Sequence, residues 1–256
     1  MSDAEAVGFT LLGGENDIED ARLVDLYAYP VDTSGYVVRA NAIVSLDGGA
    51  TTEGTSGGLG GPGDRRLFAI LRELADVILV GAGTARAENY AGARMTAAQR
   101  ERRRQRGQAE VPPVALVTRS GGLRQDLRVL VDTEVPPLVL TCAASAGRAR
   151  QSVGSAAEVL DCSGADADRV DLARALALLA DRGVPRVLTE GGPSLLGALI
   201  ADGLIDEVCL TTAPLVVGGA AMRIVTGSED VLTRMRRAHI LTDTDGYLYS
   251  RYVADR

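Results

Sequence analysis

The sequence predicts an α/β protein with a mixed, mostly parallel central sheet flanked by helices and ending in a C-terminal antiparallel hairpin. Short apolar runs alternate along the chain with segments whose apolar residues recur at helical spacing, a pattern typical of parallel strands joined by helices. The last two alternating runs meet at Asp245-Gly246, which favours a tight turn between antiparallel strands. Hydrophobic residues make up 46% of the chain and aromatic residues only 4%, so we expect an aliphatic core.

The 256 residues are expected to form one domain preceded by an extension. Residues 1–35 are the N-terminal extension, with a short amphipathic helix around Asp17 to Tyr27 followed by Pro30 and Gly35. Residues 36–256 contain no repeat, low-complexity tract or linker, and a chain of this length buries a substantial core. We therefore treat 36–256 as a single domain.

The elements of this domain follow from local patterns. The first strand is predicted over 36–46, and the helix after it has Asp64 as its N-cap. The apolar face of that helix consists of Leu67, Ile70, Leu71 and Leu74. Further strands are predicted at 77–80, 113–118, 137–142, around 159, 184–189 and 208–217. A helix through Leu172 and Leu179 has Asp168 and Asp171 in its first turn, and another over 194–202 ends at Gly203.

The composition excludes several kinds of chemistry. All 27 basic residues are Arg, so the chain has no phosphate-binding loop of the G-x-x-x-x-G-K-[ST] type and no lysine for a Schiff base. His239 is the one histidine, and Cys142, Cys162 and Cys209 are widely separated. No metal site, and no zinc-dependent deaminase motif, is therefore expected.

The charge distribution bears on partners and location. A net charge of −7 argues against binding nucleic acid through a basic surface. The basic run 94–106 is interpreted either as a solvated helix or loop, or as a cationic flap over an anionic ligand. The opening residues lack the features of a secretion signal, and no apolar stretch reaches the length of a membrane span. We expect a soluble cytoplasmic protein with no membrane partner.

The segment VLTEGGPSLLGALI, residues 187–200, is the most informative about function. An apolar strand ends at Glu190, two glycines allow close backbone approach, and Pro193 suits the first position of a helix. The free N–H groups and the helix dipole at such a turn suit a pyrophosphate. An ordinary tight connection between strand and helix is the alternative.

Two further strand ends have polar or glycine-rich turns. The turn GAGTAR follows the strand at 77–80, but Arg86 stands where a dinucleotide fingerprint has a third glycine. Together with the turn after Glu190 it would suit an extended cofactor. Arg119 and Ser120 follow the strand at 113–118, and an arginine beside hydroxyls suits the 2′-phosphate that distinguishes NADP from NAD. A simple polar turn is the alternative there.

The first strand and the loop after it suggest a ligand site. Asn41 lies in an apolar run and needs a polar partner, such as a ligand. Asp47-Gly48-Gly49 is interpreted either as a turn or as part of the site. The glycine-dense stretch TTEGTSGGLGGPGD, residues 51–64, is either disordered or wraps a ligand.

Five motifs in order resemble the reductase domain of riboflavin biosynthesis, in the dihydrofolate reductase-like superfamily. They are NAIVSLDGGATTEGTSG, ILVGAGTARAEN, LVTRS, LTEGGPSLLGALIADGLIDEV and APLVVGG. The resemblance covers about residues 36–254 and implies an NADPH-dependent reductase, usually a homodimer. Its reaction delivers hydride to C1′ of 5-amino-6-(5-phosphoribosylamino)uracil, a small phosphorylated pyrimidine.

The resemblance also implies roles for single residues. The cofactor pyrophosphate would lie against Gly191, Gly192, Pro193, Ser194, Leu195 and Leu196. Other cofactor positions are Thr84 and Glu88, with Arg119 and Ser120 at the adenosine-phosphate end. Substrate positions are Ser56, Arg72 and Glu190, to which the strand and helix patterns add Asn41 and Asp64.

The chemistry needs one proton besides the hydride. Glu190 or Asp47 is expected to donate it, with a pKa raised by an apolar cleft. Many relatives have Lys or Arg after SLDG, where this chain has Gly49. This departure leaves open a dihydrofolate or pteridine reductase on the same fold, and an NADP-binding protein without turnover. His239 is expected to be a strand residue outside the chemistry.

Overall fold

A single ten-stranded sheet organises the molecule. The computed structural model describes residues 8–30, 35–227 and 230–255. The strand order is β1-β9-β10-β8-β2-β7-β3-β4-β5-β6. Neighbours from β8 to β6 are parallel, whereas β1, β9, β10 and β8 pair antiparallel. The predicted fold class, mixed and mostly parallel with a C-terminal hairpin, is confirmed.

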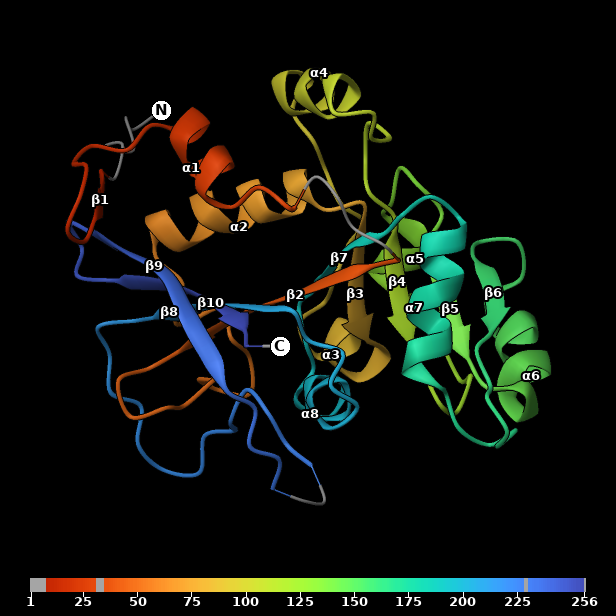
Figure 1. Ribbon diagram of the computed structural model, residues 1–256. Coiled ribbons are helices and arrows are strands. Elements are labelled where there is room, and N and C mark those ends of the chain that lie inside the picture. The colour runs from red at the N-terminus through yellow and green to blue at the C-terminus, as the bar shows by residue number, and fades with distance from the viewer. Residues whose placement is uncertain (1–7, 31–34, 228–229, 256) are drawn as a thin grey trace.

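The elements are labelled in Figure 1. The strands are β1 (Phe9–Leu11), β2 (Val37–Val44), β3 (Val77–Gly81), β4 (Val114–Val117), β5 (Leu138–Thr141), β6 (Glu158–Asp161), β7 (Arg186–Thr189), β8 (Glu207–Thr212), β9 (Met235–Asp243) and β10 (Leu248–Ala254). The helices are α1 (Asp20–Leu26), α2 (Pro62–Leu74), α3 (Ala82–Ala87), α4 (Ala97–Gln105), α5 (Arg128–Val131), α6 (Ala143–Val153), α7 (Leu172–Asp181) and α8 (Pro193–Ala201).

Three predicted boundaries were wrong. Helix α2 begins at Pro62 with Gly61 as N-cap, because proline presets the helical φ and has no N–H to satisfy. Asp64 therefore lies inside the first turn. Asp171 is the N-cap of α7, accepting a 2.9 Å hydrogen bond from the Arg174 N–H, and Asp168 precedes the helix. Strand β8 ends at Thr212, since Pro214 cannot continue the ladder.

Helices cover both faces of the sheet. Leu188 of β7 lies beside Ile78 of β3, so the two clusters that contain them share one face, which α1, α2, α5 and α6 cover. Val187 and Leu79 point to the other face and pack against α7 and α8. Figure 1 shows α1 and α2 side by side over the antiparallel end, with α6 and α7 at the opposite end.

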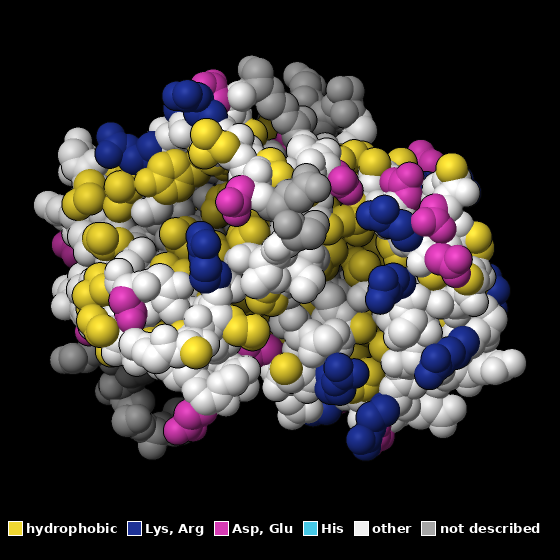
Figure 2. All heavy atoms as spheres, turned by 90° about the horizontal axis from the view of Figure 1, so that it is seen from below, with side chains coloured by type: hydrophobic (Ala, Val, Ile, Leu, Met, Phe, Trp, Pro, Cys, Tyr) yellow, Lys and Arg dark blue, Asp and Glu magenta, His cyan; other side chains and the backbone are white. Residues whose placement is uncertain are grey.

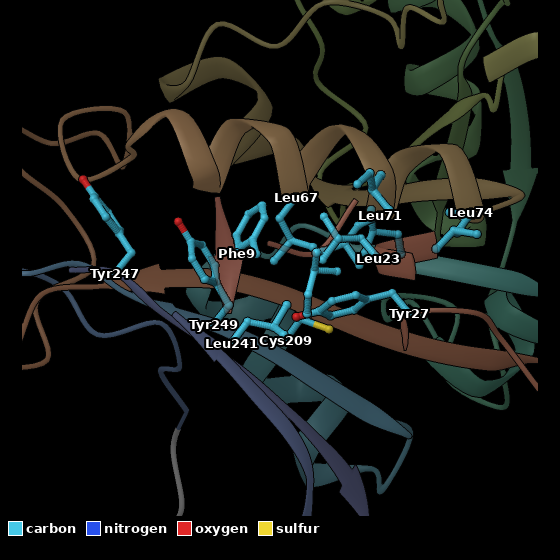
Figure 3. Packing of buried hydrophobic residues seen from close by; sticks show 14 of the residues in the cluster. Phe9, Leu23, Tyr27, Leu67, Leu71, Leu74, Cys209, Leu241, Tyr247 and Tyr249 are labelled. Carbon is cyan, nitrogen blue, oxygen red and sulfur yellow. The ribbon is translucent and has the colours of Figure 1, made fainter. Parts of the chain in front are cut away.

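The apolar face of α2 packs on the antiparallel strands as its spacing predicts. Figure 3 shows Leu67, Leu71 and Leu74 on the side of the helix that faces the sheet, with Leu241, Tyr249 and Tyr27 in the same cluster. The first turn of α2 is close to these strands, since a Cβ on Gly63 would lie 2.3 Å from the Tyr249 hydroxyl. This packing fixes the position of the first turn of α2, which includes Asp64, relative to the antiparallel strands.

The extension is joined to the sheet and to a buried ionic group. Strand β1 pairs with β9. Arg39, which is fully buried, donates a 2.7 Å hydrogen bond to Glu207 and a 2.6 Å hydrogen bond to the Tyr27 carbonyl just after α1. Arg251 donates to Glu207 and to the Leu26 carbonyl. The extension therefore satisfies charges that the domain buries.

The basic run 94–106 folds mainly as α4, and its arginines have protein partners. Arg103 donates to the carbonyls of Glu73 and Ala75 at the end of α2, at 2.7 and 2.6 Å. Arg102 and Arg106 bind the Glu73 carboxylate. The segment is a helix, as one reading expected, but it is not solvated throughout, because Arg103 is buried against the end of α2. Among the described residues, no helix is long and apolar enough to cross a membrane.

Candidate active site

A cavity of about 360 Å³ lies where β2, β3 and β7 meet the glycine-dense loop and the start of α2. Parallel strands present their carboxyl ends at one edge of the sheet, so residues far apart in sequence converge there. The predicted site residues on its wall are Asn41, Ser56, Asp64, Thr84, Glu88, Glu190, Gly191, Gly192, Pro193 and Leu196. The glycine-dense stretch thus lines a cavity.

Glu190 is held by three hydrogen bonds. Its carboxylate accepts two 2.7 Å hydrogen bonds from Arg72 and one of 2.8 Å from the Tyr90 hydroxyl. The Glu190 side chain is only 2% exposed. Burial by itself would lower the pKa of Arg72, but the Glu190 carboxylate raises it above its ordinary value. Glu190 lines the cavity, whereas its partner Arg72, a predicted substrate residue, lies outside the lining, in a neighbouring hollow with Phe68 and Tyr90.

The turn from β7 to α8 exposes backbone donors. Gly191 and Gly192 have φ values of +84° and +59°, a conformation that L side chains rarely adopt. A Cβ on Gly192 would lie 2.5 Å from Thr84 Oγ1, so the two glycine turns are in close contact. The Gly81 N–H also donates to the Gly191 carbonyl at 2.9 Å. This cradle at a helix N-terminus fits a pyrophosphate.

Ser56 and Glu88 are bonded to each other. The Ser56 N–H donates a 2.8 Å hydrogen bond to Glu88 Oε1, while the Glu88 N–H donates to the Thr84 carbonyl. Glu88 thereby ties the glycine-dense loop to α3. The contact brings a predicted substrate position and a predicted cofactor position to the same part of the cavity.

Asp64 lines the cavity from the first turn of α2. Its half-buried carboxyl group interacts with the Thr211 hydroxyl of β8. Burial raises the pKa of Asp64 above its ordinary value, outweighing Thr211 and Arg65, which lower it. Asp64 is thus a cavity carboxyl group whose protonated form is favoured relative to that of an exposed aspartate.

Asp47 has the opposite environment. Its exposed carboxylate accepts hydrogen bonds from Ser45 Oγ at 2.5 Å and from the N–H groups of Val217 and Gly218 at 3.1 and 2.7 Å. These bonds, that from Ser45 first, lower the pKa of Asp47 to about 2. The raised pKa expected for Asp47 was therefore wrong. Asp47 is also outside the residues that line the cavity.

Four predicted cofactor residues lie beyond the cavity wall. Arg119 and Ser120 are exposed after β4, and β3 separates β4 from β7. Ser194 Oγ lies 3.5 Å from Thr226 Oγ1, and Leu195 packs into the core behind the turn. These positions are compatible with an extended ligand that continues along the edge of the sheet, and they stay predictions.

Several wall residues were missed from the sequence. Phe68 and Tyr90 flank Arg72, whose guanidinium lies 4.2 and 5.7 Å from their ring centroids. Tyr90 is one of few aromatic residues and follows the motif that ends at Asn89, which is a signal that could have found it. Met222 and Ile224 also line the cavity, from the segment between β8 and β9. No local pattern marks them.

One face of the molecule has a surface of mixed character. Figure 2 shows the molecule from below, with charged side chains scattered and hydrophobic ones visible between them. Among the described residues, no group of three or more His, Cys, Asp or Glu side chains could hold a metal ion.

Comparison with known proteins places the chain in a family. The family model described as the RibD C-terminal domain matches residues 36–249. The chain belongs to the RibD C-terminal domain family. The match begins where the extension was predicted to end.

Individual relatives agree with this family. The chain is 30% identical over 196 residues to the 2,5-diamino-6-ribosylamino-4(3H)-pyrimidinone 5′-phosphate reductase of Methanothermobacter thermautotrophicus, covering 77% of this chain and 85% of the relative. The protein of the same name from Archaeoglobus fulgidus is 29% identical, over 72% of this chain and 82% of its own. The predicted oxidoreductase of the riboflavin-biosynthesis reductase type is confirmed.

A solved structure supports the fold. A pyrimidine reductase-like protein from Corynebacterium diphtheriae matches with a TM-score of 0.76 and 26% identity, over 86% of this chain and 92% of that one. The chain therefore shares its α/β architecture with a pyrimidine reductase-like protein. The strand ends of this chain place Thr84, Glu190 and Asn41 around one cavity.

Proposed function

We propose that the protein is an NADPH-dependent reductase of a phosphorylated ribosylaminopyrimidine, which it converts to the ribityl compound by reduction at C1′. The observation that carries this proposal is the cavity whose wall includes Glu190, paired with Arg72, together with the two glycine turns. One wall suits the hydroxyl-rich part of a substrate and the other suits a pyrophosphate. The names of the two archaeal relatives favour the 2,5-diamino form of the substrate over the uracil form.

The residues present fit a dinucleotide. The open N–H groups at the start of α8, the positive φ of Gly191 and Gly192, and the contact with Thr84 form a cradle for its pyrophosphate. Arg119 and Ser120 follow β4, which is separated from β7 by β3. They would meet the adenosine phosphate, and an arginine at that position favours NADPH over NADH. When bound, the cofactor supplies the hydride.

The protein's own task includes moving one proton. Glu190 accepts hydrogen bonds from Arg72 and Tyr90, and Asp47 has a lowered pKa, so neither is well placed to donate. Asp64 lines the cavity and has a raised pKa. We assign the proton donor to Asp64, with Glu190 binding substrate hydroxyls.

The phosphate of the substrate needs a cation at the cavity. Gly49 supplies none, and Arg72 is committed to Glu190. Of the described arginines, Arg65 is the one on the wall of this cavity. It is assigned to the phosphate. Arg65→Ala should raise KM for the phosphorylated substrate by about tenfold while leaving KM for the dephosphorylated compound unchanged. Equal effects on both would remove this assignment.

The test of the function is oxidation of NADPH by the purified protein with each of three substrates. Loss of NADPH absorbance with the 2,5-diaminopyrimidinone, and weaker loss with the uracil form, is the expected result. Turnover with dihydrofolate alone would replace the proposal with a pteridine reductase. Tight binding of NADPH without turnover on any of them would mean a binding protein that retains the fold.

The partners and location remain those predicted from the sequence. A homodimer in the cytoplasm, acting on a small phosphorylated substrate without nucleic acid or membrane, is our proposal. Sedimentation of the purified protein measures the oligomeric state, and a monomer at working concentration would contradict it.

A further inference from the structure

The segment 213–227, between β8 and the residues before β9, forms one wall of the cavity. Met222 and Ile224 on this segment line the cavity together with residues of α3 and of the start of α8. The segment contains no helix or strand, so its own backbone bonds do not determine its path. Contacts with the rest of the molecule must do so.

Two groups of contacts hold this wall. At the α8 side, the Thr226 N–H donates to the Pro193 carbonyl at 3.1 Å, and a Cβ on Gly197 would lie 2.0 Å from the Thr226 carbonyl oxygen. At the β2 side, the Leu46 N–H donates to Leu215 and the Ala50 N–H donates to Met222, at 2.8 and 2.7 Å.

Asp47 joins the wall to the turn after β2 through its side chain. One carboxylate accepts from Ser45 Oγ, Val217 N and Gly218 N at once. The turn itself is tight, because the Gly48 N–H donates to the Ser45 carbonyl and the Gly49 N–H to Ser45 Oγ. A charged acceptor in a preformed turn makes stronger bonds than a neutral one.

Gly49 fits under the same wall. A Cβ at this position would lie 3.0 Å from Ala221 Cβ and 3.5 Å from Val217 Cβ. The glycine therefore allows the wall to approach the turn closely, and a long basic side chain at 49 would displace it. Gly49, in place of the basic residue of many relatives, and the hydrogen bonds of Asp47 therefore both allow the segment 213–227 to pack against the turn after β2.

We propose that Asp47 is a positioning residue: its carboxylate fixes the segment 213–227 so that Met222 and Ile224 close the cavity over the substrate. This role rests on the proposed function and replaces that of proton donor. The segment is the wall closest to the SLDG turn, so its position sets the shape of the cavity without contributing a reacting group.

The test compares Asp47→Ala and Asp47→Asn with the whole protein, using NADPH and the 2,5-diaminopyrimidinone substrate. Asp47→Ala should raise KM for the pyrimidine about tenfold, because a displaced wall no longer fits the substrate. The decrease in kcat should be smaller than the increase in KM. Asp47→Asn keeps an acceptor oxygen and should recover part of the loss. Hydrogen exchange at Val217 and Gly218 should become faster in Asp47→Ala. The pH profile of kcat should stay that of the wild type in both variants.

Asp161→Ala is the matched control. It removes another exposed carboxylate that accepts a backbone N–H, from Ser163 at 2.9 Å, at the far edge of the sheet. It should leave KM unchanged. If both Asp47 variants were equally inactive and their pH profile of kcat lost one limb, Asp47 would again be the proton donor and the proposal would be wrong. A lower Tm with unchanged KM and unchanged exchange at Val217 and Gly218 would overturn the proposal.

The failure of the proposed function has a different signature. If the wild-type protein turns over none of the pyrimidines, the function fails, while hydrogen exchange of the ligand-free variants still measures whether Asp47 holds the wall. Fast exchange in Asp47→Ala would then support the geometric part, and unchanged exchange would contradict it.

Discussion

Three carboxylates near the cavity differ in role because their surroundings differ. Glu190 is paired with Arg72 and Tyr90, Asp47 is bonded to three donors, and Asp64 is half-buried with a hydroxyl partner. We propose that the same functional group serves as a substrate-binding acceptor, a wall anchor or an acid according to the donors around it.

Asp64→Asn tests the proton donor. The pKa of Asp64 is raised by burial, so the protonated donor is fully present below that pKa and is lost as pH rises through it. We expect Asn to lower kcat by about 100-fold and to remove this descending limb. The measurement is kcat against pH under saturating NADPH and substrate. If Asp64→Asn kept the kcat of the wild type and the descending limb of its pH profile, Asp64 would be excluded as the proton donor.

Glu190→Gln tests substrate binding at the ion pair. The amide cannot accept both Arg72 hydrogen bonds as a carboxylate does, so turnover should fall by more than about tenfold. NADPH affinity, measured by quenching of its fluorescence, should change little because the cradle is backbone. Tyr90→Phe removes a single bond to the same carboxylate and should have a smaller effect. A large loss of cofactor affinity in Glu190→Gln would contradict this role.

At the scale of elements, the residues at the start of α8 follow the local preferences of proline and glycine. The contact of α8 with α3 does not follow from such preferences. Pro193 begins the helix, and Gly191-Gly192 supply positive φ. The approach of α3 to Gly192 depends instead on the adjacency of β3 and β7. The cradle is therefore a joint product of two βα turns.

Gly192→Ala should weaken NADPH binding by about tenfold, a loss of about 1.4 kcal/mol, because the new Cβ would lie 2.5 Å from Thr84 Oγ1 and displace the turn. Gly183→Ala is the control, since Gly183 has a φ of +78° after α7 and a Cβ there meets nothing within 4 Å. Both variants should lose stability, but only Gly192→Ala should lose cofactor affinity in calorimetry. Equal affinities would place the pyrophosphate elsewhere.

For the whole molecule, the extension and the C-terminal strands share a buried group of charges. Arg39 and Arg251 meet at Glu207, and both donate to carbonyls at the end of α1. His239 on β9 lies in the same region, with its ring 4.8 Å from that of Tyr27. Removing a partner from such a group leaves a buried charge uncompensated, so the extension and the domain should unfold together.

The stability should therefore depend on His239 at mildly acidic pH. Burial, then Arg251 and Arg39, lower the pKa of His239 to about 4. The unfolded chain, with an ordinary pKa of about 6.5, binds the proton first, so stability is lost as pH falls from about 6.5 to about 4. We expect Tm to fall by about 3 °C or more over this range, and His239→Phe to flatten that part of the curve.

Thermal unfolding followed by circular dichroism between pH 4 and 7 checks this, with NADPH turnover at neutral pH as the control for His239→Phe. Turnover should be unchanged, because His239 lies outside the cavity wall. A curve that keeps the full acidic slope without His239 would mean that other groups bind the protons.

The sequence predicted the strands of the domain well because their apolar runs are short and bounded by turn residues, but it missed β1 in the extension. It predicted α1, α2, α7 and α8 from their apolar stripes or flanking glycines. It left α4 open because an arginine-rich segment has no apolar stripe, and Arg103 is buried only through its bonds to the end of α2. It also missed α6, which is rich in alanine and arginine.

By itself the sequence determined most of the strands, the helices with apolar stripes, the glycine turns and the motifs of the family, since these depend on neighbours within a few residues. Only the tertiary structure decided the surroundings of the acids, from which we infer their roles. Glu190 meets Arg72 across 118 positions and Asp47 meets Val217 across 170. Burial and hydrogen-bond donors set the charge of a carboxyl group, and packing between distant segments supplies both.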